Sequence, residues 1–121
     1  MWPFQNASRG LSHRRVDDDF AVTGQIGTGD IPAIVAAGFR SIICARPDNE
    51  EMGQPAFAAI AAAAEAAGLH AVYIPVSSMI GEGHLIRMES ALKDLPRPML
   101  GYCRSGARAT ALYTTAKRLT A

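Results

Sequence analysis

The sequence has few cysteines, little net charge and no long apolar run. Its two cysteines can form at most one disulfide, which excludes a disulfide scaffold and favours a reducing compartment such as the cytoplasm. A net charge of +1 gives no electrostatic basis for binding nucleic acid or a membrane surface. The most apolar stretch, Ala56–Ala67, contains Glu65 and is shorter than the roughly 20 residues of a membrane helix. We therefore expect neither nucleic acid nor membrane as a partner.

The 121 residues suffice for one compact domain, and the 49% hydrophobic content supports a folded core. The first residues lack a basic start followed by an apolar core, so we expect no secretory signal. Residues 1–12 are weakly patterned and are interpreted as a flexible leader, although Trp2 and Phe4 could cover a surface groove or mediate dimer contacts. Residues 13–121 are interpreted as a single domain, with the oligomeric state open.

The hydrophobic pattern predicts an α/β fold. Short β-branched runs alternate with amphipathic or alanine-rich segments, and Gly38 and Gly68 stand where helices end with a left-handed residue. Pro55 is placed to open the alanine-rich helix. The expected strands cover residues 14–16, 20–23, 39–44, 69–75 and 99–102. The repeated order of helix, glycine and apolar strand predicts a mainly parallel central sheet flanked by helices.

The segment Cys103–Arg108 lies between the last expected strand and the last helix, at the edge of a parallel sheet where ligands usually bind. A loop entering a helix there can turn its backbone N–H groups toward an anion, and Gly106 permits the tight turn. Arg108 can bind a tetrahedral oxyanion through two N–H groups. We expect Cys103 to lie in an electropositive cup that favours the nucleophilic thiolate over a merely structural thiol.

The six residues CRSGAR resemble the active-site loop of rhodaneses, in which four residues separate Cys from Arg; cysteine-dependent phosphatases have five. The upstream segments VDDDFAVTGQI, AAGFRSIICARPDNEEMGQP and AAGLHAVYIPV resemble a bacterial family described as β-lactamase-hydrolase-like, phosphatase-like domains, for which sulfurtransferase activity is also described. The resemblance implies a fold like that of dual-specificity phosphatases. The resemblance also implies that Cys103 is the nucleophile and that Arg108 binds the oxyanion. It implies a substrate-binding cradle formed by Arg104, Ser105, Gly106 and Ala107, with Ala109 and Thr110 beside it.

Three features depart from the phosphatase pattern. Ala109 stands where phosphatases usually have Ser or Thr, and Thr110 either takes over that role or bonds back onto its own helix. Tyr102 stands where His is usual. Residues 76–85 contain no Asp to serve as general acid, which leaves Glu82 and His84 as candidates.

These departures favour sulfur chemistry as the main expectation. A small loop without a strong proton donor suits removal of a sulfane sulfur from thiosulfate or a similar oxyanion donor, with a Cys103 persulfide passed to a thiol or cyanide acceptor. A phosphatase that forms a phosphocysteine is the alternative, and an inactive oxyanion-binding regulatory module is a second one. No cofactor is implied, and the three scattered histidines predict no metal site.

Three further residues could assist. Cys44 ends the strand that, by the family resemblance, lies beside the strand before Cys103. Cys44 could form a reversible disulfide with Cys103 or accept its sulfur, but we favour the interpretation that it is a small buried hydrophobic residue. Arg46 and Asp48 lie in a loop at the same edge and could line the pocket, brace its rim or pair with each other, and we favour bracing.

Overall fold

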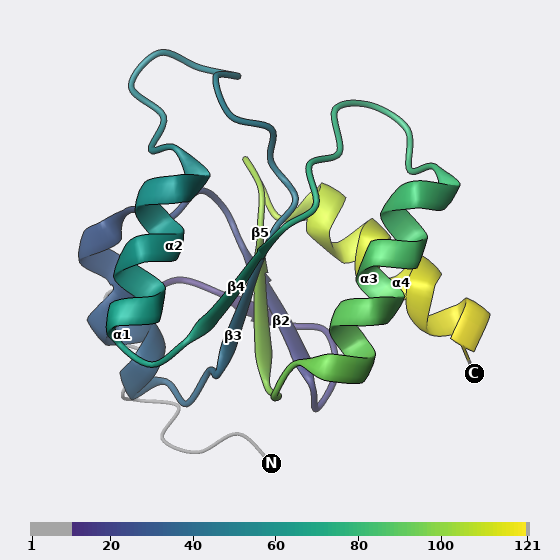
Figure 1. The fold of residues 1–121 in the computed structure, drawn as a ribbon, viewed down its shortest axis with the longest axis horizontal. Coiled ribbons are helices and arrows are strands. Elements are labelled where there is room, and N and C mark those ends of the chain that lie inside the picture. Colours follow the sequence, from purple (N-terminus) through teal and green to yellow (C-terminus); the bar gives the residue numbers. More distant parts are fainter. Residues whose placement is uncertain (1–10, 121) are drawn as a thin grey trace.

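The computed structural model describes residues 11–120, which form a five-stranded sheet between two pairs of helices (Figure 1). The strands are β1 (Arg14–Arg15), β2 (Phe20–Thr23), β3 (Ser41–Cys44), β4 (His70–Tyr73) and β5 (Met99–Tyr102). They are ordered β1-β2-β5-β3-β4; β1 is antiparallel to β2 and every other pair is parallel. The expected α/β fold with a mainly parallel sheet is confirmed.

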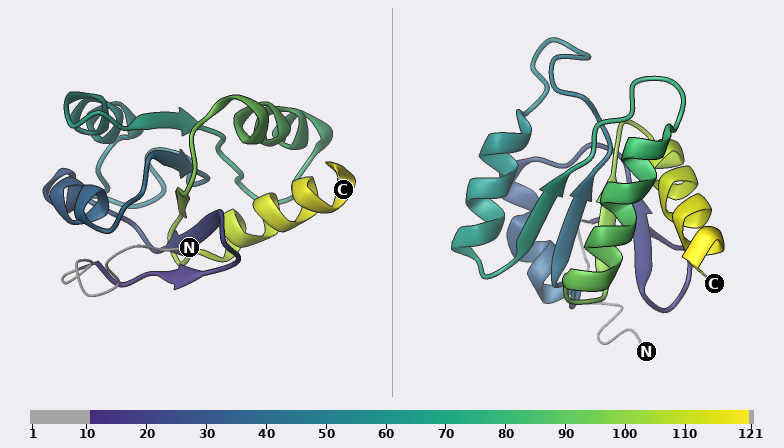
Figure 2. Two further views of the ribbon diagram at one scale, coloured as in Figure 1. Left: turned by 90° about the horizontal axis from the view of Figure 1, so that it is seen from below. Right: turned by 45° about the vertical axis from the view of Figure 1, so that its right-hand side comes forward.

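The helices form two layers. They are η2 (Thr28–Asp30), α1 (Ile31–Ala36), α2 (Phe57–Ala66), α3 (Glu82–Asp94) and α4 (Ala107–Thr120). Helices α1 and α2 cover one face of the sheet and α3 and α4 the other, as the view from below in Figure 2 shows. Each face has its own apolar cluster, one containing Ile34 and Ile60, the other Met88 and Leu112, and burial of both clusters stabilises the three-layer packing.

Glycine ends two of the helices as expected. Gly38 and Gly68 have φ values of 96° and 88°, the left-handed region that glycine enters without a steric penalty. The start of α2 differs from expectation: the helix begins at Phe57, two residues after Pro55. The Phe57 N–H donates to Asp48 Oδ1 at 2.8 Å, so a carboxylate from the preceding loop sets the start of the helix.

The packed domain begins earlier than residue 13. Leu11 is buried in the core, and the Ser12 carbonyl accepts a 2.6 Å hydrogen bond from Thr23 Oγ1. These two residues of the expected leader therefore belong to the fold. Trp2, Phe4 and the rest of residues 1–10 lie outside the described residues.

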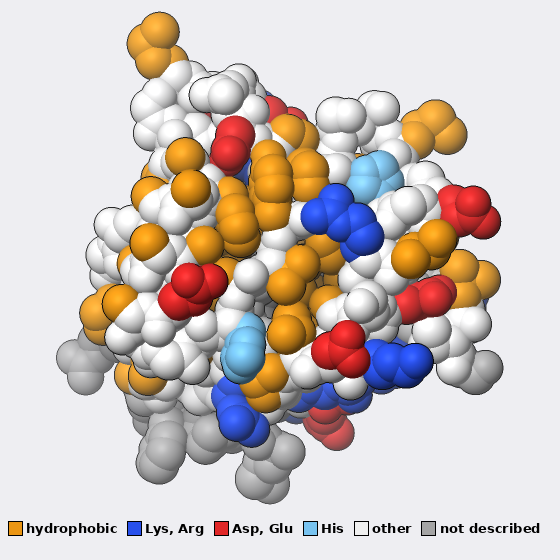
Figure 3. Space-filling model, viewed as in Figure 1, with side chains coloured by type: hydrophobic (Ala, Val, Ile, Leu, Met, Phe, Trp, Pro, Cys, Tyr) orange, Lys and Arg blue, Asp and Glu red, His pale blue; other side chains and the backbone are white. Residues whose placement is uncertain are grey.

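The four parallel strands end at one edge of the sheet, where the connecting loops project in Figure 1. The loops after β2, β3, β4 and β5 therefore meet there. β4 is the edge strand on the side of the sheet away from β1. Around β4, between α2 and α3, Figure 3 shows a band of hydrophobic side chains. No helix within residues 11–120 is long and apolar enough to cross a bilayer.

Candidate active site

The loop after β5 wraps its backbone around the Cys103 sulfur. The Gly106 N–H donates to Cys103 Sγ at 3.0 Å, and the Cys103 side chain is fully buried. Gly106 has a φ of 97°, which only glycine adopts readily, and a side chain there would lie 3.4 Å from Val22. The conformation that aims this N–H at the sulfur therefore requires glycine.

The loop after β2 supports the cradle from the side. A Cβ atom on Gly24 would lie 2.9 Å from the carbonyl oxygen of Arg104, closer than folded proteins tolerate. The Cys103 N–H also points at the Thr23 carbonyl, at 3.4 Å. The first turn of the cradle is thus pressed against residues 23–24, and the absence of a side chain on Gly24 permits that approach.

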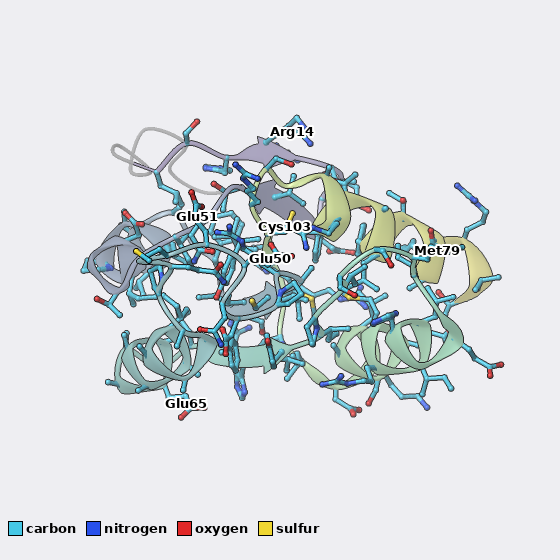
Figure 4. All side chains as sticks on the ribbon, turned by 90° about the horizontal axis from the view of Figure 1, so that it is seen from above. Arg14, Glu50, Glu51, Glu65, Met79 and Cys103 are labelled. Carbon is cyan, nitrogen blue, oxygen red and sulfur yellow. The ribbon has the colours of Figure 1, made fainter. Side chains whose placement is uncertain are left out.

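Arg108 is held by a glutamate that sequence analysis did not single out. Its Nη1 and Nη2 donate to the two carboxylate oxygens of Glu50, at 2.6 Å and 2.8 Å, and Nη1 also donates to the Val76 carbonyl at 2.8 Å. In the view from above, Glu50 and Cys103 project close to each other near the centre of the molecule (Figure 4). The hydrogen bond from Arg108, joined by that from Arg46, lowers the pKa of Glu50 to about 2, so Glu50 is ionised at neutral pH.

Arg46 is the buried anchor of this loop. It is 2% exposed and donates to Glu50 at 2.9 Å, Gln25 at 3.0 Å and Glu51 at 3.2 Å. Burial lowers the pKa of Arg46, but its hydrogen bonds to Glu50 and Glu51 outweigh burial and raise it. Arg46 thus joins the loop after β3 to the loop after β2. With Arg108, Glu50 and Glu51 it forms a cluster of two positive and two negative charges beside the cradle.

Two residues proposed for substrate binding are directed elsewhere. The Thr110 hydroxyl donates to the Gly106 carbonyl at 2.8 Å, which is the back-bonding alternative and not a contact with the thiolate. Ala109 is buried below the cradle in the apolar cluster of α4. Arg104 and Ser105 are exposed, and Ser105 Oγ accepts the Ala107 N–H at 3.3 Å.

The remaining candidates differ in their placement. Asp48 caps α2 and does not contact Arg46 or Arg108 through any side-chain hydrogen bond described within residues 11–120. Glu82 is exposed in the first turn of α3. His84 Nδ1 accepts the Gly81 N–H at 2.8 Å, so the neutral ring carries its proton on Nε2, which can donate.

Cys44 ends β3 and Cys103 directly follows the neighbouring strand β5; both are free thiols, and they belong to different apolar clusters. The Cys44 thiol donates to the Arg46 carbonyl at 3.3 Å, and burial raises its pKa. A protonated thiol inside a packed cluster matches the interpretation of Cys44 as a small buried hydrophobe.

Sequence analysis missed Gly24, Gln25 and Glu50. All three lie in segments that resemble the phosphatase-like family, but in loops, where the sequence gives no functional signal for them. Their contacts join the loops after β2, β3 and β5, which are distant in sequence, so no local pattern reveals them. Within residues 11–120 no group of three or more His, Cys, Asp or Glu side chains could hold a metal ion.

Comparison with known proteins corrects the expected chemistry. Residues 12–120 match the family described as "Beta-lactamase hydrolase-like protein, phosphatase-like domain". A solved Neisseria meningitidis structure described as a candidate phosphatase is 30% identical, with a TM-score of 0.77 over 86% of this chain and 75% of its own. A candidate phosphatase of Shewanella putrefaciens, 16% identical over 93% of this chain and 74% of its own with a TM-score of 0.77, shares the fold. The sulfurtransferase expectation is therefore wrong: the family and the solved relative are described as phosphatase-like, which favours the phosphatase alternative over the reaction inferred from the short loop and the missing Asp.

A relative in Agrobacterium fabrum, the beta-lactamase hydrolase-like protein, is 37% identical over 106 residues. Those residues are 87% of this chain and 25% of the relative, so the chain spans about a quarter of that protein. The match of residues 12–120, the common fold and the shared identity agree. The chain belongs to the family of phosphatase-like domains of beta-lactamase hydrolase-like proteins.

Proposed function

We propose that this domain hydrolyses phosphate monoesters through a phosphocysteine intermediate. The observation that carries the proposal is the cradle itself: the Cys103 sulfur accepts the Gly106 N–H at 3.0 Å, and the Arg108 guanidinium is fixed at the same edge of the sheet. The family descriptions and the solved relative at 30% identity support the same chemistry. The substrate class is a small oxyanion ester, and its alcohol or phenol part is left open.

The reaction is a double displacement without redox change. The Cys103 thiolate attacks phosphorus, the S–P bond forms, and the ester oxygen leaves with the bonding electron pair and takes up a proton. Water then attacks phosphorus, the S–P bond breaks, and inorganic phosphate and the thiolate are released. Arg108 and the backbone N–H groups of residues 104–107 stabilise the oxygens that gain charge in both transition states.

Proton donation to the leaving group is assigned to the first turn of α3. His84, with its proton on Nε2, and exposed Glu82 are the two candidates there. An aryl phosphate needs little proton donation because phenolates are good leaving groups, so it tests the nucleophile separately from the acid. A free cysteine nucleophile also suits a reducing compartment, for which we propose the cytoplasm.

The test is release of nitrophenolate from p-nitrophenyl phosphate by the wild type, Cys103→Ser and Arg108→Lys. We expect turnover by the wild type, none by Cys103→Ser, and a loss of about 100-fold or more for Arg108→Lys, because Lys cannot form the two-pronged contact. Rapid quenching with intact mass measurement should detect one phosphoryl group on the wild type alone. Binding of inorganic phosphate without turnover of any ester would instead support the inactive anion-binding module.

A further inference from the structure

The hydrogen bonds of Arg108 leave one particular side of its guanidinium group open. A guanidinium carries five N–H bonds, two on each Nη and one on Nε. The Nη1 pair is used by Glu50 and Val76, and one Nη2 hydrogen by Glu50. The Nε–H and the second Nη2–H have no oxygen or nitrogen acceptor described within residues 11–120, and these two parallel bonds form the side fork that fits two oxygens of a tetrahedral oxyanion.

Arg108 interacts with Glu50 and also with the Cys103 side chain. The hydrogen bond and charge of Glu50 contribute most to the raised pKa of Arg108, and Cys103, five residues earlier in the same loop, raises it further. Glu50 occupies the end of the guanidinium formed by Nη1 and Nη2 and leaves the Nε side without a carboxylate partner. A flexible arginine side chain would otherwise sample many rotamers before reaching this orientation.

Glu50 is itself fixed by contacts that do not involve Arg108. Its Oε1 also accepts Arg46 Nε at 2.9 Å, and the buried Arg46 is bonded to Gln25 at 3.0 Å. Gln25 follows Gly24, whose backbone lies against the cradle. The Glu50 carboxylate is thus held in a fixed position relative to the loop that follows Cys103.

We propose that Glu50 is the positioning residue of the active site: it holds the end of the Arg108 guanidinium so that Nε and Nη2 face the oxyanion bound above Cys103. The inference rests on the proposed phosphatase function. Glu50 does not touch the substrate; it acts through Arg108.

The test compares Glu50→Gln with Glu51→Gln. Both substitutions remove one carboxylate from the same loop and one partner from Arg46, but only Glu50 contacts Arg108. A Gln amide keeps the shape of Glu yet turns an N–H donor toward a guanidinium that can only donate, so the paired contact is lost. Turnover of p-nitrophenyl phosphate, inhibition by inorganic phosphate and thermal midpoint are measured for each variant, with kinetics below all midpoints.

We expect kcat/KM of Glu50→Gln to fall about 10-fold or more, mainly through kcat, because a misdirected Arg108 stabilises the transition state less. Inhibition by inorganic phosphate should weaken, and Glu50→Asp should restore part of kcat because it keeps the charge. Glu51→Gln should stay within about twofold of the wild type.

Three outcomes would overturn the inference. Kinetics of folded Glu50→Gln within twofold of the wild type would reduce Glu50 to a structural residue. Equal losses in both variants would assign the effect to Arg46 and the loop. Tighter phosphate binding by Glu50→Gln would mean that Glu50 blocks the oxyanion site. A wild type without turnover, tested first beside Cys103→Ser, would instead contradict the proposed function itself.

Discussion

At the scale of single residues, two glycines determine the shape of the cradle. Gly106 supplies the left-handed turn that brings its N–H to the sulfur, and Gly24 permits the close approach of the Arg104 carbonyl. Sequence analysis identified Gly106, because tight anion-binding loops need such a residue. It could not identify Gly24, since the atom that a side chain would strike belongs to a segment 80 residues further along the chain.

Gly24→Ala should impair catalysis more than folding. The added methyl group would lie 2.9 Å from the Arg104 carbonyl oxygen, so the cradle must shift, and a displacement near 1 Å can cost about 100-fold in rate. We expect kcat/KM on p-nitrophenyl phosphate to fall about 10-fold to 100-fold. Gly29→Ala is the matched control, because a Cβ atom there meets nothing within 4 Å. Equal activity of the two variants would refute the role of Gly24.

At the scale of elements, the loop between β3 and α2 determines both the start of a helix and the geometry of the site. Asp48 accepts the Phe57 N–H and its own N–H donates to the Tyr73 hydroxyl at 2.8 Å, so this loop is fastened to α2 and to the end of β4. Glu50, two residues further on, reaches Arg108 from that fixed base. The sequence indicated a polar loop here, but the helix cap is nine residues from its partner, outside the range of local capping patterns.

Asp48→Ala should lower the free energy of unfolding by about 1 kcal/mol, the usual effect of removing a capping oxygen. Asp48→Asn keeps an oxygen acceptor and should lose less. Urea unfolding followed by circular dichroism measures both variants. An unchanged midpoint and slope for Asp48→Ala would show that the bond to Phe57 contributes no stability.

At the scale of the whole molecule, a cluster of ionised side chains joins the loops after β2, β3 and β5. Its stabilising effect depends on pH through Glu50, whose pKa is lowered from an ordinary 4.5 to about 2 by Arg108 and Arg46. Between these two values the unfolded chain binds a proton that the folded chain does not. Stability due to Glu50 is therefore complete above pH 4.5 and declines as pH falls toward 2.

Acid unfolding of the wild type should consequently be steeper than that of Glu50→Gln between pH 4.5 and pH 2. The measurement is the urea midpoint at several pH values in this window, at constant ionic strength. The two curves should converge toward pH 2, where the wild-type carboxylate also becomes protonated. Parallel curves across the whole window would mean that the folded state does not lower the pKa of Glu50.

The sequence by itself determined the α/β fold and the order of strands and helices along the chain, and it indicated Cys103 and Arg108 of one loop as the candidate nucleophile and oxyanion ligand. These features depend on short-range patterns: apolar periodicity, helix-ending glycines at Gly38 and Gly68, and the spacing of Cys103 and Arg108. Only the tertiary structure decided what holds that arginine, what fills the space beside the cradle, and where the Thr110 hydroxyl points. Those contacts join residues from different loops, and their partners become neighbours only once the parallel strands align their ends at one edge of the sheet.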